Sequence, residues 1–565
     1  MAFQVSPGVN VSEFDLTTVV PAPGGTYGAY AGKFNWGPIG VVQPIDNELK
    51  LAERFGKPSA GDTGNNATSF FTCANFLAYS GSLLVSRATA YNSTNSLAPR
   101  AGGSPVARLI ANSNDYSNNS TISDATFAAR YAGTLGDNLS VHMWANNSIN
   151  DWTFGTYFDR APSTTNYIND RFGDVNDELY IVVVDRTGAL SGTPNTVLEK
   201  YSASKATNAR DENNNSNYYK DVLFNKSRWV YQVGDPATID GNVWSVAANT
   251  GYVFPNLATD AANVAYDLTA GHYSWCSSAN VEVAYDLFKD PSYDVSLIMT
   301  GKHTSTVVNY VIDNVADLRK DCVVFASPPL ANVQAADPAT SIAAYRETLS
   351  FSSYGVLDSG WKYQYDKYND VYRYIPLNGD IAGLCARTDE VREPWFSPAG
   401  VTRGQIKNIV KLAYNPNQAD RDTLYKSDVN PVVNFVGEGT FLYGDKTLLG
   451  RQSAFDRINV RRLFIQLEKV IASAAKLSLF EFNDDFTRSQ FVSLVDPYLR
   501  SVLAGRGIYD YRVVCDERNN TADVIDRNEF VGDIYIKPAR SINFIQLNFV
   551  ALRSGVSFDE IIGRF

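Results

Sequence analysis

The side chains that most often act in catalysis or metal binding are few and scattered in this chain of 565 residues. Its three histidines, His142, His272 and His303, lie far apart, and none has a second histidine at the spacing of a zinc site. No HExxH, GxSxG or CxxC motif is present. The five cysteines lie mostly in apolar surroundings, at Cys73, Cys276, Cys322, Cys385 and Cys515. We therefore expect structural histidines, buried free thiols, no metal, no cofactor and no catalytic residue.

One stretch resembles a phosphate-binding loop. GTFLYGDKT, at 439–447, follows the pattern GxxxxGK[ST] except that Asp445 is inserted between the second glycine and Lys446. The insertion moves the lysine out of register and puts a carboxylate where phosphate oxygens would bind. We expect a glycine-containing turn between strands here. A nucleotide-driven motor is the alternative that a working loop would imply.

Acidic residues among aromatic ones suggest a second chemistry. Asp358 and Asp366, or the cluster at 483–485, could be the paired carboxylates of a glycosidase, with aromatic rings stacking on sugars. A carbohydrate-binding adhesin or glycosidase therefore stays as an alternative. The simpler interpretation of GWKYQYDKYNDVYRYIP, at 360–376, is a pair of strands whose tyrosines lie opposite one another. Three basic side chains would lie at its rim: Lys362, Lys367 and Arg373.

The composition indicates a large globular protein of about two to four domains. Hydrophobic residues make up 44% and charged residues 19%, and the 33 Tyr and 30 Phe favour strands. The net charge of −11 would repel a phosphate backbone, so nucleic acid is not an expected partner. We find no signal peptide and no run of about 18 apolar residues, so we expect a soluble chain that inserts in no membrane.

Hydrophobic periodicity places the longer elements. One segment is predicted to form a strand at 295–299, a helix at 304–320 and a second strand at 321–329, which favours a parallel pair with a right-handed crossover. Apolar residues at i, i+3, i+4 and i+7 predict a long helix over 455–481, with Asp456 as its N-cap. The fold class is therefore mixed α+β and α/β in several domains.

Shorter elements are expected nearer the N-terminus. A hairpin region, a helix closed by Gly56, a second helix and a strand should follow one another at 25–42, 47–56, 68–80 and 82–88. Residues 91–122 are rich in Ser, Asn, Gly and Pro and predict a loop or a reduced surface insertion. Further strands are expected at 137–145, 178–185 and 228–234.

Both ends of the chain carry strand patterns. Near the start, Val9 and Val11 alternate with Asn10 and Ser12, before any core exists to receive them. Near the end, apolar residues alternate with polar ones at Ile545, Leu547 and Phe549. A strand without a local partner must pair elsewhere, either far along this chain or on another copy.

Several long segments carry a family resemblance. Those of the C-terminal half are KYQYDKYNDVYRYIPLNGDIAGLCARTD, WFSPAG, LYGDKT, FDRINVRRLF, YRVVCDERNNT and VIDRNEFVGDIYIKPARSINFIQLNFVA, which begin at residues 362, 395, 442, 455, 511 and 524. The opening contributes SPGVNVSE and AGKFNWGP. In this order they resemble the contractile tail sheath protein of T-even-type myoviruses. The resemblance is dense over 354–565, clear at 1–90 and 295–329, and patchy between.

The resemblance implies three parts. A strand-exchange arm would occupy 1–20, and a middle and outer α/β domain with a parallel βαβ unit 21–345. A C-terminal α+β domain, 346–565, would be completed by the N- and C-terminal strands and face the tail tube. Such sheaths often carry a protruding domain after the first α/β segment, where only 91–122 lies here. We therefore expect that outermost domain to be reduced.

The resemblance also implies the function, that of a non-enzymatic building block. Neighbouring copies would exchange strands, with apolar side chains donated by the arm at Val9, Val11 and Phe14 and a receiving surface at Ile545, Leu547 and Phe549. Gly24 and Gly25 would form the hinge.

Hexameric rings, stacked helically, would surround the inner tail tube protein and meet baseplate and tail terminator or neck proteins. Contraction from a metastable extended state would drive the tube through the host envelope for genome ejection. The subunit would assemble in the bacterial cytoplasm and reside in the virion tail. A headless contractile injection system, either a bacteriocin or a type VI-like machine, is the near alternative.

Overall fold

The computed structural model describes residues 25–543, except 62–65, 91, 101–102, 120, 147, 236–243, 257–264 and 274–275. Contacts between Cα atoms divide the chain into two compact units. The described part of the larger unit is 25–394 and 398–470, and that of the smaller unit is 395–397 and 471–543. No helix in these described parts is long and apolar enough to cross a membrane.

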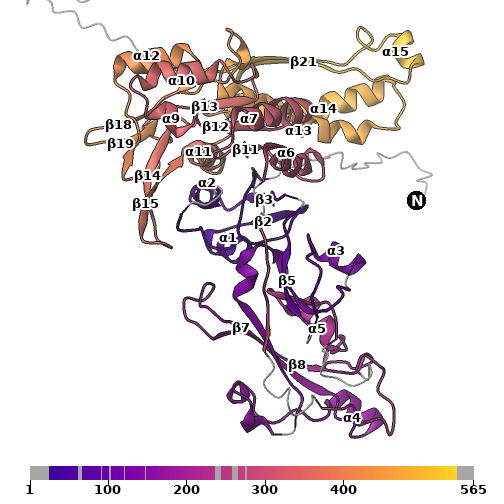
Figure 1. Cartoon of the computed structure of the whole chain (residues 1–565). Helices are drawn as coiled ribbons and strands as arrows, with labels where there is room; N and C mark the ends of the chain where they lie inside the picture. Colours follow the sequence, from indigo (N-terminus) through magenta and orange to yellow (C-terminus); the bar gives the residue numbers. More distant parts are fainter. Residues whose placement is uncertain are drawn as a thin grey trace, which may run out of the picture. The chain divides into compact units, whose positions relative to one another are not determined.

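A seven-stranded sheet forms the centre of the larger unit (Figure 1). In spatial order its strands are β17 (Val429–Asn430), β13 (Gly355–Asp358), β12 (Val323–Ala326), β11 (Leu297–Met299), β1 (Gly28–Gly32), β3 (Leu83–Arg87) and β2 (Val42–Ile45). All neighbours are parallel except β2 and β3. The predicted parallel pair is confirmed by β11 and β12, and the helical run between them contains a π-helical turn, Ile312–Ala316.

The hairpin expected at 25–42 is wrong. β1 and β2 are not neighbours, because β3 lies between them and pairs with both. All five residues of β1 are buried, which is the pattern of a central strand that is paired on both edges and covered on both faces. The boundary expected at residue 345 also falls inside this sheet, since β12 and β13 pair across it.

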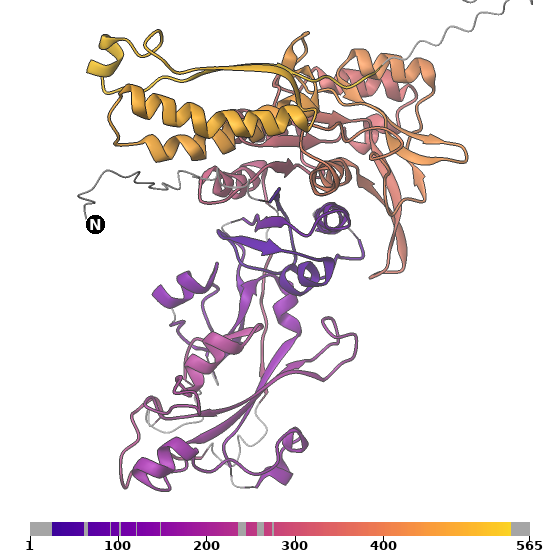
Figure 2. The ribbon, with the colours of Figure 1, turned by 180° about the vertical axis from the view of Figure 1, so that it is seen from behind.

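Helices cover both faces of the central sheet (Figures 1 and 2). One face packs against α6 (Ser278–Asp286), α7 (Ser305–Val311), α9 (Leu330–Val333), α10 (Pro338–Arg346) and α12 (Gln418–Lys426). The other packs against α1 (Glu48–Phe55), α2 (Asn66–Leu77), α11 (Asn378–Val391) and the first part of α13 (Ile458–Ala475). α1 begins and ends as predicted: the Asn47 side chain accepts from Lys50 N, and Gly56 closes the helix at φ +80°.

The helix predicted at 455–481 is shorter, and its predicted cap is wrong. α13 begins at Ile458, whereas Asp456 ends the preceding 3-10 turn η9 (Ala454–Asp456), which Ser453 caps. The apolar stripe predicted the helix correctly, but Asp456 belongs to the local 3-10 turn and lies two residues before the helix begins, so it is not the cap.

The strands predicted at 137–145, 178–185 and 228–234 are confirmed in two antiparallel sheets of the larger unit. One sheet has β10 (Ala265–Asp267), β6 (Leu139–Trp144), β7 (Glu178–Asp185) and β8 (Thr196–Ser204). The other has β4 (Asn95–Pro99), β5 (Ala125–Ala132) and β9 (Val230–Gln232), so β4 and helix α3 (Ser113–Asn118) occupy part of the expected loop 91–122. The short sequence of β4, NSLAP, lies in a stretch rich in Ser, Asn, Gly and Pro and shows no clear apolar alternation, so it did not predict a strand, yet its backbone pairs with β5.

The remaining elements are short. They are α4 (Asn166–Phe172), α5 (Tyr219–Lys226), α8 (Asp317–Arg319), β18 (Val432–Phe435), β19 (Gly439–Leu442), and the 3-10 turns η2 (Thr134–Asn138), η3 (Ile149–Asp151), η4 (Gly155–Tyr157), η7 (Leu287–Lys289) and η10 (Lys476–Ser478).

The tyrosine-rich hairpin is confirmed in detail. β14 (Trp361–Asp366) pairs antiparallel with β15 (Val371–Pro376) and with β16 (Lys411–Leu412), and Tyr363 lies opposite Tyr374. Lys362, however, is fully buried rather than at the rim. Alternation along β14 puts it on the same face as Gln364, whose side chain accepts a hydrogen bond from Asn75 of α2.

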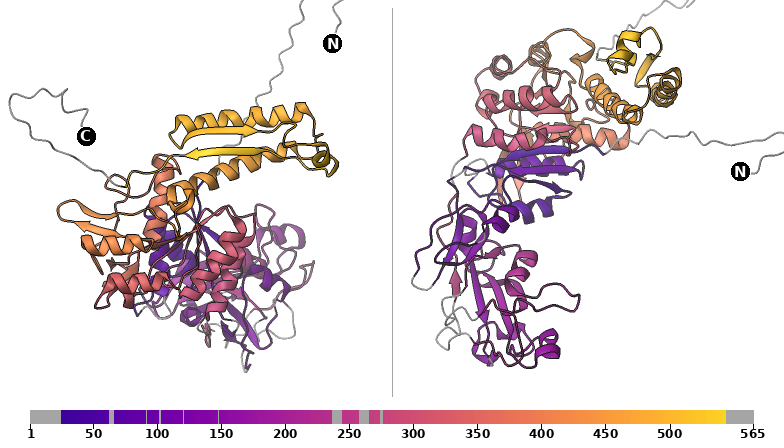
Figure 3. Two further views of the ribbon diagram at one scale, coloured as in Figure 1. Left: turned by 90° about the horizontal axis from the view of Figure 1, so that it is seen from above. Right: turned by 90° about the vertical axis from the view of Figure 1, so that its right-hand side faces the viewer.

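The smaller unit contains α14 (Asp485–Ala504), α15 (Ala522–Asp526) and two antiparallel strands, β20 (Ile508–Val514) and β21 (Asp533–Pro538). β20 packs along α14, and Figure 3 shows the strands running beside the helix. The hydroxyl of Tyr511 donates to Asp496 Oδ1 at 2.8 Å, which ties the middle of β20 to α14.

Candidate functional site

Almost all residues predicted for strand exchange or hinge motion lie outside the described residues: Val9, Val11, Phe14, Gly24, Ile545, Leu547 and Phe549. Gly25 is described and exposed. Its backbone is not in the left-handed region, and an added Cβ would meet only Tyr27 Cε2 at 3.8 Å. Glycine is therefore not required there by the conformation seen, and the hinge stays a prediction.

The described element best suited to receive a foreign strand is the β20–β21 pair. Among the residues that the structure describes, these two strands pair only with each other. Each therefore presents an outer row of backbone N–H and C=O groups, and a sheet of two strands is only marginally stable by itself. Tyr511 lies opposite Ile536 and Val513 opposite Ile534.

Polar side chains hold this pair in position. Asn520, which is 2% exposed, accepts from Val531 N at 2.9 Å and donates to Val531 O at 2.8 Å. Asn519 donates to Val514 O at 2.8 Å. The indole N–H of Trp395 donates to Gly505 O at 2.9 Å, just before β20. The connection and the start of the strands are thus fixed, while their edges are left for pairing.

A second candidate site lies at the carboxyl ends of the parallel strands, where α/β enzymes bind ligands. Asp358, the last residue of β13, is 1% exposed and accepts from Ser327 Oγ at 2.6 Å and Gly360 N at 2.9 Å. Burial raises the pKa of Asp358 to about 8. Ser327 in turn accepts from both nitrogens of Asn378, each at 3.0 Å.

Neighbouring polar groups extend this network. Asn378 donates to Gly301 O at 2.9 Å and accepts from Gly301 N at 3.0 Å, which joins the start of α11 to the end of β11. Lys362 Nζ lies 2.9 Å from Asp380 Oδ1 and donates to Lys407 O. The hydroxyl of Tyr79 also donates to Asp380, at 3.1 Å. The polar groups of this edge therefore bind one another and hold β11, β13, β14 and α11 together.

The pair of Lys362 and Asp380 was not predicted from the sequence, because the two residues lie on different elements, β14 and α11. The available signal was that Lys362 alternates with the tyrosines and shares a strand face with Gln364 and Asp366. The other proposed glycosidase carboxylate, Asp366, is also structural: it accepts from Arg373 Nε at 2.7 Å and from Tyr368 N at 2.9 Å in the hairpin turn.

The phosphate-loop-like stretch is a strand followed by a packed turn. Gly439–Leu442 is β19, paired with β18. Lys446 Nζ donates to Tyr425 O at 2.7 Å and to Asp428 at 3.2 Å, and Asp445 forms an ion pair with Arg457 at 3.3 Å. The lysine is thus held by protein groups rather than aimed at an open anion site.

The histidines and cysteines lie in structural surroundings. All five cysteines are buried and free, as predicted. A ring nitrogen of His303 lies 3.0 Å from Ala31 O, and burial lowers the pKa of this histidine to about 4. Within the described ranges, no three His, Cys, Asp or Glu side chains are grouped to hold a metal.

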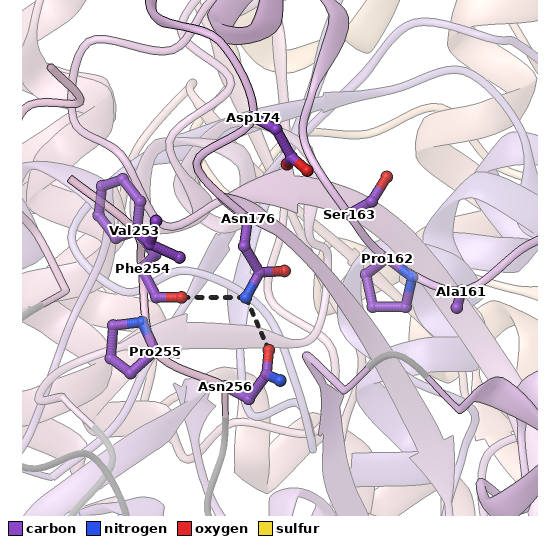
Figure 4. A pocket seen from close by; sticks show the side chains of 9 residues that line it. All are labelled: Ala161, Pro162, Ser163, Asp174, Asn176, Val253, Phe254, Pro255 and Asn256. Carbon is purple, nitrogen blue, oxygen red and sulfur yellow. Dashed lines mark hydrogen bonds between the residues drawn. The ribbon is translucent and has the colours of Figure 1, made fainter. Parts of the chain in front are cut away.

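One surface pocket, of about 610 Å³, lies in the β-rich part of the larger unit (Figure 4). Asn176 crosses it and donates to Phe254 O at 2.9 Å and Asn256 Oδ1 at 2.7 Å. The hydroxyl of Ser163 accepts from Arg160 at 2.8 Å. These polar groups are used to join two loops, and they offer no nucleophile with an adjacent base.

Comparison with known proteins agrees with the resemblance noted in the sequence. The model of the phage tail sheath protein central domain matches residues 291–448, and that of the phage tail sheath C-terminal domain matches 451–551. The tail sheath protein of Vibrio phage KVP40 is 33% identical, over 99% of this chain and 100% of that one. Its alignment extends over 703 residues, so it contains residues that this chain lacks.

The tail sheath protein of Enterobacteria phage T4 is 34% identical, over 99% of both chains. Among solved structures, the helical sheath of the anti-feeding prophage in its contracted state shares the fold, with a TM-score of 0.51 and 13% identity over 97% of this chain and 99% of that one. Identities of 33% and 34% over 99% of the chain, two adjoining domain matches and a common fold lead to one conclusion. The chain belongs to the phage tail sheath protein family.

Proposed function

We propose that the chain is the structural subunit of a contractile phage tail sheath, which polymerises round the inner tail tube and contracts to drive that tube through the host envelope. Full-length identity to phage tail sheath proteins supports the sheath role. The observation that supports strand exchange is the two-stranded sheet β20–β21. Hydrogen bonds of Asn520 to Val531 hold the connection between its strands, and its outer edges pair with no other described strand.

The strand patterns at the chain ends suit those edges. Val9 and Val11 alternate with Asn10 and Ser12, as a strand with one apolar face requires, and Phe14 would fill a further apolar position. An arm of about 15 residues reaches roughly 50 Å, enough to bridge subunits. The strand predicted at 545–549 follows shortly after β21, which ends at Pro538, and would offer the arm a receiving surface next to the β20–β21 pair.

Exchange of this kind links subunits head to tail. Donor and acceptor surfaces differ, so the contact is heterologous, and a rotation between copies that does not close produces a helical tube, here of stacked hexameric rings. The hinge at Gly24 and Gly25 lets the body of each subunit swing while the strands stay paired. If the contracted arrangement gained even about 2 kcal/mol for each subunit, a long tube would release enough energy for penetration without nucleotide.

The remaining roles follow from this assembly. The subunit acts as a non-enzymatic component of the virion tail, put together in the bacterial cytoplasm, with region 346–565 facing the tube. Its partners are further copies, the tube protein, and baseplate and neck proteins. Residues 91–122 would be the reduced insertion, and the alignment of 703 residues with the relative from Vibrio phage KVP40 shows that this relative has residues that the chain lacks. A headless injection machine would use the same mechanics, but the full-length identity to phage sheaths favours the phage tail.

Strand exchange is tested by charging the arm. Val9→Asp with Val11→Asp in the full-length chain should leave a folded subunit that forms no sheath tubes in electron micrographs. The matched control, Asn10→Asp with Ser12→Asp, places the same charges on the opposite strand face and should still assemble. Normal tubes from the Val9 and Val11 variant would refute strand exchange.

A further inference from the structure

The turn between α13 and α14 displays a cluster of large apolar side chains to solvent. We call residues 476–486 the apolar turn. Its five large apolar residues have exposed fractions between 54% and 104%: Leu477, Leu479, Phe480, Phe482 and Phe486. Apolar patches of this density are uncommon on a free protein surface and mark contacts with another molecule.

The apolar turn is held in place by polar side chains. Asn483 donates to Glu529 O at 2.8 Å and to Asn520 Oδ1 at 3.1 Å. Arg488, which is buried, donates to Asn483 Oδ1 at 2.8 Å, and Asp484 caps α14 by accepting from Thr487 N. The apolar side chains are therefore presented by a braced turn.

The backbone conformation of Phe480 is a second indication that the apolar turn is a contact surface. Its φ of +69° lies in the left-handed region, and its side chain is fully exposed. That conformation costs about 1–2 kcal/mol in a residue with a Cβ. Glycine or asparagine would adopt this conformation at a lower cost. The presence of phenylalanine at this position therefore suggests that its ring contacts another molecule.

We propose that the apolar turn packs into a second copy of this chain, as a contact between sheath subunits that is separate from strand exchange. This inference rests on the proposed function. Three phenylalanines bury roughly 500 Å² together, a large share of the about 800 Å² that one partner contributes to a stable interface.

The place of the turn favours a sheath neighbour over the inner tube. Asn520 and Glu529, which brace it, belong to the connection between β20 and β21, so the turn adjoins the sheet proposed to exchange strands. Contacts to the tube must also break when the sheath contracts. An extensive apolar contact would oppose that release, whereas a contact between sheath subunits can persist through it.

The test combines two changes in the full-length chain. In the background of Val9→Asp and Val11→Asp, which blocks strand exchange, sedimentation velocity should still show concentration-dependent self-association. Adding Phe480→Ser and Phe482→Ser should weaken that association at least about tenfold, as expected for the loss of interface hot spots. Val436→Ser removes an equally exposed apolar residue from the larger unit and should change nothing. Circular dichroism confirms that each variant is folded.

Two kinds of result would overturn the inference. One concerns self-association: it is unaffected by the serine substitutions, or it is absent although the turn is intact. The other is a serine variant that forms empty sheaths normally but fails to assemble on purified tail tubes, which would assign the turn to the tube. A failure of the strand-exchange proposal is distinguishable, because the variant Val9→Asp with Val11→Asp would then form normal sheath tubes while the turn is intact.

Discussion

The ammonium nitrogen of Lys362 lies 2.9 Å from Oδ1 of Asp380, and neither side chain is exposed to solvent. The pair joins β14 to α11 at the edge of the central sheet. Burial lowers the pKa of Lys362 and raises that of Asp380, and their mutual attraction opposes both shifts. An ion pair in this position orients the hairpin rather than performing chemistry.

Replacing one residue of this ion pair should destabilise the fold far more than replacing both residues by apolar ones. Lys362→Met leaves the Asp380 carboxylate buried and unpaired, so we expect the free energy of unfolding to fall by about 3–5 kcal/mol. The double variant Lys362→Met with Asp380→Leu should recover much of that loss. Urea denaturation of the unassembled subunit measures both. The control Lys367→Met removes an exposed partner of Glu48 and should cost less than about 1 kcal/mol.

Asp358 should make stability depend on pH. The unfolded carboxyl loses its proton near its ordinary pKa of about 4, whereas the folded one holds it until about pH 8. Its contribution is therefore complete below about pH 4 and is lost progressively as pH rises to about 8. Asp358→Asn should flatten the fall in the free energy of unfolding over this range. An unchanged pH profile in urea melts would contradict the raised pKa.

Close helix packing depends on Gly379 at the start of α11. A Cβ there would lie 2.4 Å from the backbone oxygen of Thr72 in α2, which cannot move aside as a flexible side chain can. Gly379→Ala should therefore lower the free energy of unfolding by about 1–3 kcal/mol.

Gly25→Ala, where space is open, should leave the unassembled subunit unchanged in thermal melts. If it slows contraction of assembled sheaths, the hinge is supported.

The clamp at Asn520 should matter for assembly. Asn520→Ala leaves Val531 N–H and C=O without their side-chain partner and should loosen the connection of β20 and β21, at about 1–3 kcal/mol. We expect fewer and shorter sheath tubes by electron microscopy, with unfolding of the larger unit unaltered. Glu529→Ala, which removes only an exposed ion pair with Arg527, is the control. Equal assembly of both variants would argue against β20–β21 as the receiving sheet.

Patterns that repeat over a few residues were enough to predict several elements. The parallel strands β11 and β12, the end of α1 at Gly56 and the tyrosines facing each other across β14 and β15 all follow from alternation, helical spacing or capping chemistry. The ordered segments that resemble sheath proteins were likewise present in the sequence alone. These features are local, so neighbouring residues determine them.

Tertiary structure decided which segments pair and which faces are buried. Alternation showed that Lys362 shares a face with Gln364, but only packing against α2 and α11 made that face the buried one. The insertion of β3 beside β1, and the meeting of Asp358 with Ser327 and Asn378, join segments that are far apart along the chain. The free energy of such contacts depends on the packing of the whole chain around its core, and a pattern of a few neighbouring residues does not determine that packing.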